Sequence, residues 1–405
     1  MRLVFVNRFF SPDHSSTSQM LTDLCCGLAA MGHEVHVVTS RLRYDDTAAQ
    51  LAPEEVVSGV HVLRVWTSRF GRSSLPGRAA DYLTFYLGTL ARLIGLLDRT
   101  TILVVKTDPP MISVIGAIAA RVRGARLVNW TQDLFPEVAA AAGMRIMRPA
   151  LTRMLASIRD WSLQSAALTV VIGERMRDRL LARGLGAQQI AVIHNWADGE
   201  AIVPLAHSAN PLRDQWNLQE AFVVGYSGNL GRVHEFDTVM QAAEALRDRA
   251  DIVFLFIGSG HQTTALKSEV EARELRNVRF QPYQPRETLV QSLGVCDAHL
   301  VTLRPEFEGL VVPSKFYGII AAARPVLFVG APEGEIQKLV REAECGATFE
   351  SGDSAALAQC IVRLAGDASL AQRWGENGRR LFAERFSKQI AIARWEQCLT
   401  NIQKN

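Results

Sequence analysis

Short runs of apolar residues alternate along the first half of the chain with longer segments that have the period of an α-helix. In one such segment, apolar residues from Leu21 to Met31 fall on a single helical face, and Gly32 follows as a stop signal. Strands that alternate with helices in this way predict a parallel, doubly wound sheet. The runs that predict buried strands are Leu3–Val6, Val35–Thr39, Val60–Val65, Ile102–Val105, Arg126–Trp130, Leu168–Ile172 and Ile190–Ile193.

The alternation lapses over residues 197–215, where Pro204 and Asn210-Pro211 indicate a linker, and a second open sheet follows. Beyond Asp353 the pattern is purely helical. We therefore expect an α/β protein with one domain over residues 1–200, a second over 201–385, and a C-terminal helix over 386–405 that packs back on the first domain. The second set of strands is expected at Phe222–Tyr226, Ile252–Ile257, Val278–Phe280, Ala298–Val301 and Val326–Val329.

Composition narrows the class of protein. A chain of 405 residues exceeds the roughly 250–300 residues at which a single hydrophobic core stops growing, so two domains are expected. A net charge of +3 is too small to indicate nucleic-acid binding. The six cysteines lack CxxC spacing and are expected to be buried, reduced thiols. The first apolar run turns polar at Asn7 and Arg8, too early for a signal peptide, which favours a cytoplasmic location.

A glycine-rich turn follows the first strand expected in the second domain, and there the backbone can approach a phosphate closely. Arg232 at the end of this turn can add a charge-assisted hydrogen bond at the start of the next helix. The alternative is a turn needed only for tight strand–helix packing. A second turn, Gly258-Ser259-Gly260, is consistent with the same cleft but is equally typical of a plain turn. The candidate diphosphate ligands in the first turn are Ser227, Gly228, Asn229, Gly231 and Arg232.

Pro313 and Ser314 predict a helix start, with Ser314 as a candidate cap. Lys315 lies in the first turn of that helix, where acidic residues are the usual preference. A cation there is explained if it shares its position with a bound anion, and the alternative is a solvated surface lysine.

In the first domain, Asp133 follows the strand Arg126–Trp130 and, with the Trp130 indole, suits a sugar ligand. Helix capping by Asp133 is the alternative.

Four stretches in this order resemble the retaining glycosyltransferases of family 4, which have the two-domain GT-B fold, and in particular the branch that builds bacterial exopolysaccharide and O-antigen repeats. The resemblance implies two Rossmann-like domains that face a cleft, with the nucleotide sugar in the second domain and the acceptor in the first. The stretches are Met31-Gly32-His33-Glu34-Val35, Thr131-Gln132-Asp133-Leu134-Phe135-Pro136-Glu137, Tyr226-Ser227-Gly228-Asn229-Leu230-Gly231, and Val312–Gly318 with Arg324-Pro325-Val326.

The resemblance also assigns roles to single residues. It implies that Arg232 and Lys315 act on the diphosphate and that Tyr283-Gln284 lies near the base. Many family members have two glutamates separated by seven residues. Here Gly318 occupies the second position, and Glu308 stands in for the first, although nine residues rather than seven separate the two. Where the family usually has an arginine and a lysine after the glycine-rich turn, this chain has Asn229 and His234.

The expected reaction moves a sugar, of hexosyl or N-acetylhexosaminyl type, from a nucleotide diphosphate donor to a lipid-linked or other glycan acceptor. A UDP-sugar is favoured because it is the commonest donor in the resembled branch. No Asp-x-Asp follows an apolar strand, so no metal and no cofactor are expected. In such enzymes the leaving phosphate accepts the proton of the acceptor, so Asp133 is expected to orient the acceptor. The alternatives are a non-hydrolysing nucleotide-sugar 2-epimerase and a catalytically silent subunit that binds the donor.

The segment Arg64–Arg92 interleaves arginines with aromatic and aliphatic residues. This pattern suits a peripheral contact with an anionic membrane, as a polyprenyl-linked acceptor would require. The alternative is a core helix preceded by a solvated arginine loop. The apolar stretch from Tyr82 to Leu97 is interrupted by Arg92 and is too short to span a bilayer. The arginines of the segment are Arg64, Arg69, Arg72, Arg78 and Arg92.

Overall fold

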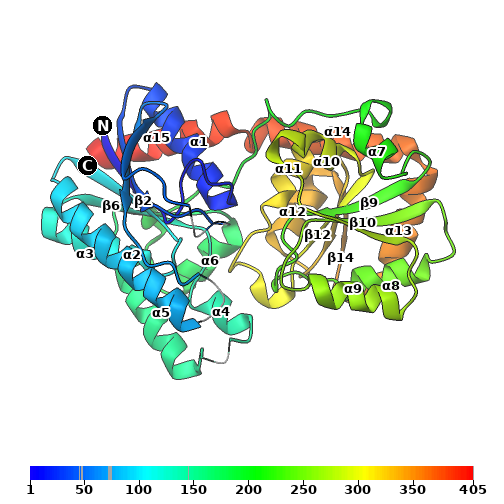
Figure 1. Ribbon diagram of the computed structural model, residues 1–405, viewed down its shortest axis with the longest axis horizontal. Helices are drawn as coiled ribbons and strands as arrows, with labels where there is room; N and C mark the ends of the chain where they lie inside the picture. The colour runs from blue at the N-terminus through cyan, green and yellow to red at the C-terminus, as the bar shows by residue number, and fades with distance from the viewer. Residues whose placement is uncertain (45, 47–48, 72–74, 145, 405) are drawn as a thin grey trace. The chain divides into compact units, whose positions relative to one another are not determined.

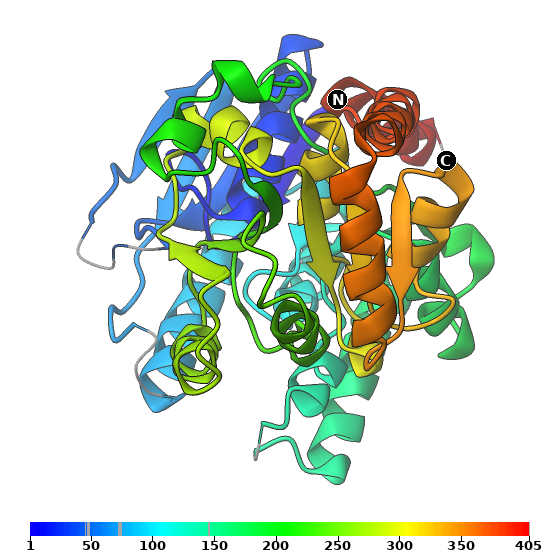
Figure 2. The same ribbon diagram turned by 90° about the vertical axis from the view of Figure 1, so that its right-hand side faces the viewer.

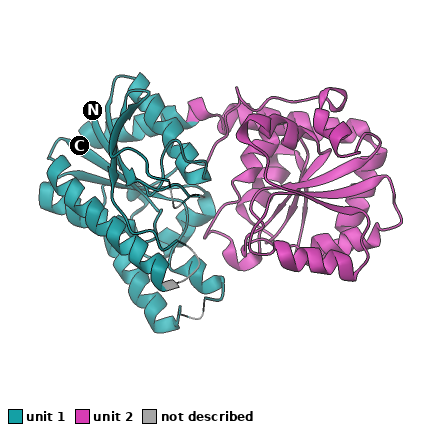
Figure 3. Cartoon of the chain, in the orientation of Figure 1, with its two compact units in different colours: residues 1–194, 391–405 teal, residues 195–390 magenta. Residues whose placement is uncertain are grey.

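The computed structural model describes residues 1–44, 46, 49–71, 75–144 and 146–404. The chain divides into two compact units: unit 1 contains residues 1–194 and 391–405, and unit 2 contains residues 195–390 (Figure 3). Each unit has a largely parallel sheet with helices packed against it, as the alternation of apolar runs predicted. Arg72 of the segment Arg64–Arg92 lies outside the described residues.

The sheet of unit 1 has eight strands in the order β3-β4-β2-β1-β5-β6-β7-β8. All neighbouring pairs are parallel except β3 and β4. The central strands are apolar because helices cover both faces of a parallel sheet, and every residue of β5 is buried. The strands are β1 (Arg2–Val6), β2 (Glu34–Ser40), β3 (Glu54–Val57), β4 (Val60–Val65), β5 (Thr101–Lys106), β6 (Arg126–Thr131), β7 (Leu168–Val171) and β8 (Ile190–Val192).

The helices of unit 1 pack in layers on its sheet (Figure 1). Helices α2, α3 and α5 form one row, in which α2 packs on α3 and α3 packs on α5. Helix α1 contacts the C-terminal helix α15 through Gly27 and Ile392. The helices are α1 (Ser16–Ala30), α2 (Leu75–Leu96), α3 (Ile112–Arg123), α4 (Glu137–Ala141), α5 (Pro149–Gln164), α6 (Glu174–Ala182) and α15 (Lys388–Lys404), which begins in unit 2.

The sheet of unit 2 is fully parallel, with six strands in the order β11-β10-β9-β12-β13-β14. Strand β9 lies in the middle, and the chain reverses direction across the sheet between β11 and β12. In such open sheets, ligands bind at the carboxyl ends of the strands where the order reverses. The strands are β9 (Phe222–Ser227), β10 (Ile252–Ile257), β11 (Val278–Gln281), β12 (Ala298–Thr302), β13 (Val326–Val329) and β14 (Gly346–Phe349).

A large hydrophobic cluster in unit 2 joins β9 and β10 to helices α8 and α13. Helix α13, in orange in Figure 2, lies along the sheet and packs directly on α8. The helices of unit 2 are α7 (Pro211–Gln215), α8 (Asp237–Ala245), α9 (Thr263–Ala272), α10 (Leu289–Gly294), α11 (Lys315–Ala321), α12 (Glu335–Ala343), α13 (Ser354–Gly366) and α14 (Ala368–Arg385).

Three details differ from the prediction. Strand β3 was not predicted, because its sequence Glu-Glu-Val-Val is charged and largely exposed, as suits the edge of a sheet. Strand β14 was missed because its sequence Gly-Ala-Thr-Phe is not a continuous apolar run and only Phe349 in it is buried. Met31 was expected on the buried face of α1, but it follows the end of the helix and is 53% exposed.

Two tryptophans join α15 to the core of unit 1. Trp130 on β6 and Trp395 on α15 are both fully buried, and their ring centroids lie 4.8 Å apart. Large buried aromatic rings dominate core energetics because they remove so much apolar surface from water. The last helix is therefore part of the core of unit 1. In the described part of the chain, no helix is both long enough and apolar enough to cross a bilayer.

Replacing Trp395 with alanine should lower the free energy of unfolding by about 3–5 kcal/mol, the usual cost of truncating a buried tryptophan. Urea unfolding followed by far-UV circular dichroism measures the change. Gln397 is exposed on the same helix, so Gln397→Ala is the control and should stay within about 0.5 kcal/mol of the wild type. Equal unfolding midpoints for the two variants would contradict the proposed packing.

Candidate functional site

The glycine-rich turn follows β9 and leaves the sheet at Gly228, whose φ of 128° is accessible mainly to glycine. Gly228 N donates to Ile257 O, and Leu230 N donates to Ser259 O. These bonds tie the turn to the end of β10 next to it. The turn is thus fixed by backbone contacts.

The second glycine turn packs against the first, backbone to backbone. A Cβ added at Gly258 would lie 2.3 Å from Gly228 O, and one at Gly260 would lie 2.5 Å from Leu230 O. Gly258 also has a φ of 126°. Any larger residue would force the two turns apart. The side-chain amide of Gln262 adds two hydrogen bonds from Nε2, to Gly231 O at 2.6 Å and to His234 O at 3.1 Å.

Lys315 lies beside these turns. Its Nζ donates to the Tyr226 hydroxyl at 2.6 Å, approaches His234 Nε2 at 3.3 Å and lies 4.1 Å from the centre of the Tyr226 ring. The Cβ position of Gly228 is 3.6 Å from Lys315 Cε. The structure therefore brings Lys315 and the first glycine turn together, as the sequence analysis required.

The immediate neighbours of Lys315 are uncharged. His234 Nδ1 contacts Thr302 O at 2.7 Å, and because a carbonyl oxygen can only accept, this nitrogen carries the proton and Nε2 is left to accept from Lys315. Burial and then the charge of Lys315 lower the pKa of His234 to about 3, so it is neutral near pH 7. Among the described residues, no carboxylate lies within ion-pair distance of Lys315. Burial lowers the pKa of this partly buried lysine to about 7.

Arg232 is exposed, and its Nη2 contacts His261 Nε2 at 2.6 Å. It was predicted to start a helix, but α8 begins only at Asp237, so this part of the prediction was wrong. The intervening residues form an irregular turn, because Tyr226, His234 and Phe236 pack ring to ring there. The Arg232 guanidinium lies beside the second glycine turn, because its partner His261 directly follows Gly260.

The remaining residues predicted for this site differ in what they contact. The Ser227 hydroxyl is buried and has no hydrogen-bond partner among the described residues, and the Asn229 carbonyl accepts from the Tyr226 hydroxyl at 2.9 Å. Ser314 is the N-cap of α11, but it makes no side-chain capping hydrogen bond. This part of the prediction was wrong, because its φ and ψ are already helical.

Glu308 and the Tyr283-Gln284 turn also lie in unit 2. Glu308 Oε1 accepts from Glu335 N at 2.8 Å, so this carboxylate holds the first backbone N–H of α12. Tyr283 is 55% exposed and its hydroxyl contacts Ser259 O at 3.4 Å, which places its ring beside the second glycine turn. Gln284 is partly buried, and its Nε2 donates to Pro282 O at 3.0 Å. Roles for these residues toward a base or a sugar stay predictions.

In unit 1, Asp133 lies past the carboxyl end of β6 and is exposed. Desolvation by the surrounding protein, and then the charge of Asp108, raise its pKa to about 6, while Lys106 opposes the shift. Lys106 is itself buried, with its pKa lowered to about 7 by desolvation, and its Nζ lies 3.8 Å from the centre of the Trp130 ring. A cavity of about 80 Å³ adjoins Asp133, lined by polar and apolar residues that include Thr107, Ser113, Thr131, Phe135 and Arg159.

Two expectations about this region need correction. Trp130 is fully buried between Lys106 and Trp395, so its indole is not available to stack on a sugar. Asp133 is not a helix cap, because α4 begins at Glu137 with Pro136 as its N-cap. The Glu137 carboxylate accepts two hydrogen bonds from Arg159, at 2.8 and 2.9 Å, so it has a structural role within unit 1.

Sequence reasoning missed Tyr226 and Gln262 as parts of the site. In the sequence, Tyr226 is simply the last apolar residue of a predicted strand. Its hydroxyl contacts Lys315 because β12 pairs with β9 and the chain after β12 returns to this end of the sheet. Gln262 stands at the start of α9 without a motif to single it out. His234 had been noticed only as the residue at a position where the family has a lysine.

Two family descriptions match the chain. The glycosyl transferase 4-like domain matches residues 17–196, and the description glycosyl transferases group 1 matches residues 209–381. Together with the two parallel sheets and the glycine turns, these matches define a glycosyltransferase of the GT-B fold. The chain belongs to family 4 of these enzymes.

Two relatives and two solved structures illustrate this membership. WbjE of Pseudomonas aeruginosa, named a probable glycosyltransferase, is 25% identical over 76% of each chain. WcaI of Escherichia coli, named for a glycosyl transferase of colanic acid biosynthesis, is 23% identical over 84% of this chain and 86% of its own. A sucrose-phosphate synthase of Thermosynechococcus elongatus superposes with a TM-score of 0.78 over 99% of both chains at 16% identity. HepE of Anabaena, solved with UDP and glucose, gives 0.73 over 99% of both chains at 16% identity.

Gly258→Ala tests whether the two turns form the nucleotide site. The added Cβ clashes with Gly228 O, and the strain of about 1–3 kcal/mol at such a backbone position should weaken UDP binding by about tenfold or more. Gly352 has a comparable φ of 100° but open space around it. Gly352→Ala therefore controls for backbone strain alone and should keep wild-type affinity in calorimetric titrations. Equal UDP affinity in both variants would exclude the turns from the site.

Proposed function

We propose that this protein transfers a sugar from a UDP-sugar to a polyprenyl-linked glycan acceptor during synthesis of a cell-surface polysaccharide, with retention of configuration. The observation that carries the proposal is Lys315, an ammonium group whose hydrogen-bond partners among the described residues are a phenol and a neutral imidazole, beside two glycine turns. Such a cation lacks a counter-ion within the described protein. A diphosphate at the turns would supply it and accept backbone N–H donors as well.

The donor choice draws support from relatives. HepE has been solved with UDP and with UDP-glucose, and WcaI is named for colanic acid synthesis. The proposed reaction breaks the bond between the sugar C1 and the β-phosphate oxygen and forms a bond from C1 to the acceptor oxygen. Lys315 and Arg232 stabilise the negative charge that develops on the leaving UDP. In this proposal the two cations take that role without a metal ion.

The acceptor hydroxyl must lose a proton in the same step. We assign this proton to the leaving phosphate, and we assign Asp133 to orientation of the acceptor. With a pKa of about 6, Asp133 is mostly ionised near pH 7 and can accept a hydrogen bond from an acceptor hydroxyl. A lipid-linked acceptor would place the protein peripherally at the cytoplasmic face of the membrane.

The transferase proposal is tested by incubating the purified protein with radiolabelled UDP-sugars, with and without a polyprenyl-diphosphate-linked glycan. Label that moves to the lipid fraction supports the proposal. A changed sugar without acceptor would instead identify a 2-epimerase, and UDP-sugar binding without any turnover would identify a silent donor-binding subunit. Either of these two results contradicts transfer. Analysis of the anomeric linkage in the product tests retention.

Lys315→Met should weaken UDP binding by about 30-fold or more, because it removes a charge partner from a part-buried site. Lys338 is a lysine of the same unit with a largely exposed side chain in an ion pair with Glu342. Lys338→Met is therefore the matched control and should bind UDP as the wild type does. Isothermal titration calorimetry measures all three proteins, and a wild-type affinity in Lys315→Met would remove the lysine from the site.

UDP binding should take up a proton at Lys315. With a pKa of about 7 in the unliganded protein, the lysine loses its charge as the pH rises above 7. A bound diphosphate favours the charged form and raises this pKa, so the affinity should fall as the pH rises from about 7 to 9. The terminal phosphate of UDP is about 90% ionised at pH 7 and more so above it, since its second pKa is about 6, so its own titration changes the affinity little over this range. Titrations in buffers of different ionisation enthalpy measure the uptake, which should vanish in Lys315→Met; uptake that persists there would contradict the assignment.

A further inference from the structure

Exposed hydrophobic side chains are concentrated on one row of helices in unit 1. Among the described residues, sixteen large hydrophobic side chains are exposed, and only three of them, Val203, Tyr283 and Val362, belong to unit 2. Eight belong to helices α2, α3 and α5 or lie beside α2. We call them the apolar face: Trp66, Leu83, Leu87, Ile118, Val122, Met154, Ile158 and Trp161.

The helical spacing shows that the face is a second apolar stripe on each helix. Leu83 and Leu87 are four residues apart on α2, as Ile118 and Val122 are on α3. On α2, Phe85 and Leu93 already supply the stripe that packs in the core. Packing in the core therefore does not account for the second stripe. Leu87 is 60% exposed and Val122 is 64% exposed. A cluster of such exposed hydrophobic side chains usually marks a surface that binds a partner or a membrane.

The three helices present these stripes on the same side. Helices α2, α3 and α5 follow strands that succeed one another in the same direction across the sheet, so right-handed connections place them on one face of it. The helices also pack side by side in sequence (Figure 1). Stripes that point away from a common sheet are turned to the same side, and together they form a continuous surface.

Charge on these helices is one-sided. The acidic residues of the three helices are Asp81 and Asp160, and both are buried in contacts within unit 1. Arg121 and Arg153 are exposed directly beside Val122 and Met154. A surface with exposed arginines, tryptophans and aliphatic side chains but no exposed carboxylate on its helices matches the composition of helices that lie in the interface of an anionic bilayer.

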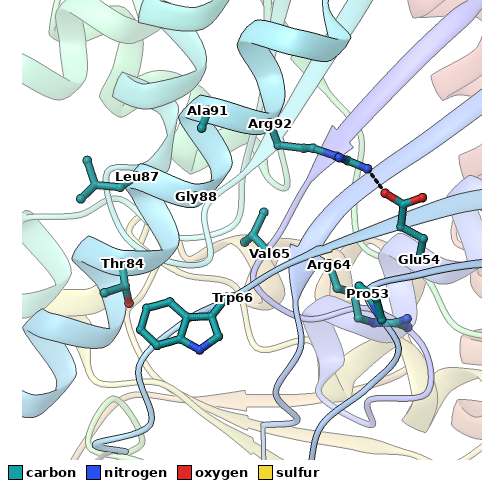
Figure 4. Close-up of a pocket in the computed structure, with 10 residues that line it drawn as sticks. All are labelled: Pro53, Glu54, Arg64, Val65, Trp66, Thr84, Leu87, Gly88, Ala91 and Arg92. Carbon is teal, nitrogen blue, oxygen red and sulfur yellow. Dashed lines mark hydrogen bonds and ion pairs between the residues drawn. The ribbon is translucent and has the colours of Figure 1, made fainter.

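A groove at the edge of the face adds an aromatic anchor. The groove has a volume of about 670 Å³, and Trp66, Leu87 and Ala91 line it, with the ion pair between Glu54 and Arg92 at its rim (Figure 4). Trp66 is 63% exposed. Indole rings are enriched at the level of lipid headgroups because one part of the ring is apolar and its N–H is polar.

From this placement we infer that the apolar face of α2, α3 and α5 docks the protein on an anionic lipid surface. The sequence analysis placed the membrane contact in the segment Arg64–Arg92, which contains α2, and the present inference adds α3 and α5. It rests on the proposed function in one respect, the location of the protein at a membrane. A second copy of the chain fits less well, because a symmetric contact would bring Arg121 and Arg153 against like charges, with no exposed helical carboxylate to pair them.

The test compares two variants with the same type of substitution. R121Q/V122Q/R153Q/M154Q removes two arginine–hydrophobic pairs from the face. V362Q/R363Q removes an equivalent exposed pair from α13 in unit 2. Each is measured by co-sedimentation with vesicles of phosphatidylcholine alone and of phosphatidylcholine with phosphatidylglycerol. Circular dichroism verifies folding, and UDP titration checks the donor site independently, so that loss of docking and failure of the proposed function are told apart.

We expect wild-type protein and V362Q/R363Q to bind the anionic vesicles, more weakly as salt rises, and neither to bind phosphatidylcholine alone comparably. The quadruple variant should lose roughly tenfold or more in apparent affinity, since each arginine near the surface contributes about one factor of five. Three results would overturn the inference: equal binding by the quadruple variant, equal binding to both vesicle types, or a lipid-free wild-type dimer that the quadruple variant dissociates.

Discussion

A lysine whose contacts are neutral is the constraint on which the proposed donor site depends. The Lys315 ammonium is held by the Tyr226 hydroxyl and the unprotonated nitrogen of His234, and neither group can balance its charge. His234 cannot become a second cation near neutral pH, because Thr302 fixes its proton on the other nitrogen and burial depresses its pKa. Many family 4 enzymes have a further cation after the glycine turn. This chain has the neutral His234 there, and its imidazole helps to position Lys315.

The glycine turns provide the other half of the site. Gly228 and Gly258 both have positive φ, and their backbones touch so closely that a Cβ at Gly258 has no room. Two loops that follow neighbouring strands are thereby fused into one rigid edge. Backbone N–H groups on that edge and the nearby Lys315 cost little reorganisation when an anion binds, which is the property that electrostatic catalysis requires.

Much of this arrangement could be predicted from the sequence, because parallel strands buried on both faces are continuous apolar runs. Every strand between the edges was located, while the edge strands β3 and β14 were missed because neither is a continuous apolar run. The position of Lys315 beside Gly228 was predicted through the family resemblance, which assigns both residues to the diphosphate. Its contacts with Tyr226 and His234 were not predicted, since they depend on side chains that meet only after the chain crosses the sheet. The prediction that Trp130 stacks on a sugar was wrong for a related reason. The sequence around Trp130 does not show that Trp395, which is distant in the chain, covers its ring.

The central claim is that a nucleoside diphosphate binds at the two glycine turns with Lys315 as its counter-ion. A crystal structure of the protein with UDP tests this most directly. The account predicts the β-phosphate within hydrogen-bond distance of Lys315 Nζ and of backbone N–H groups in the turn after β9. A well-ordered UDP bound elsewhere, with Lys315 still in contact only with Tyr226 and His234, would contradict it.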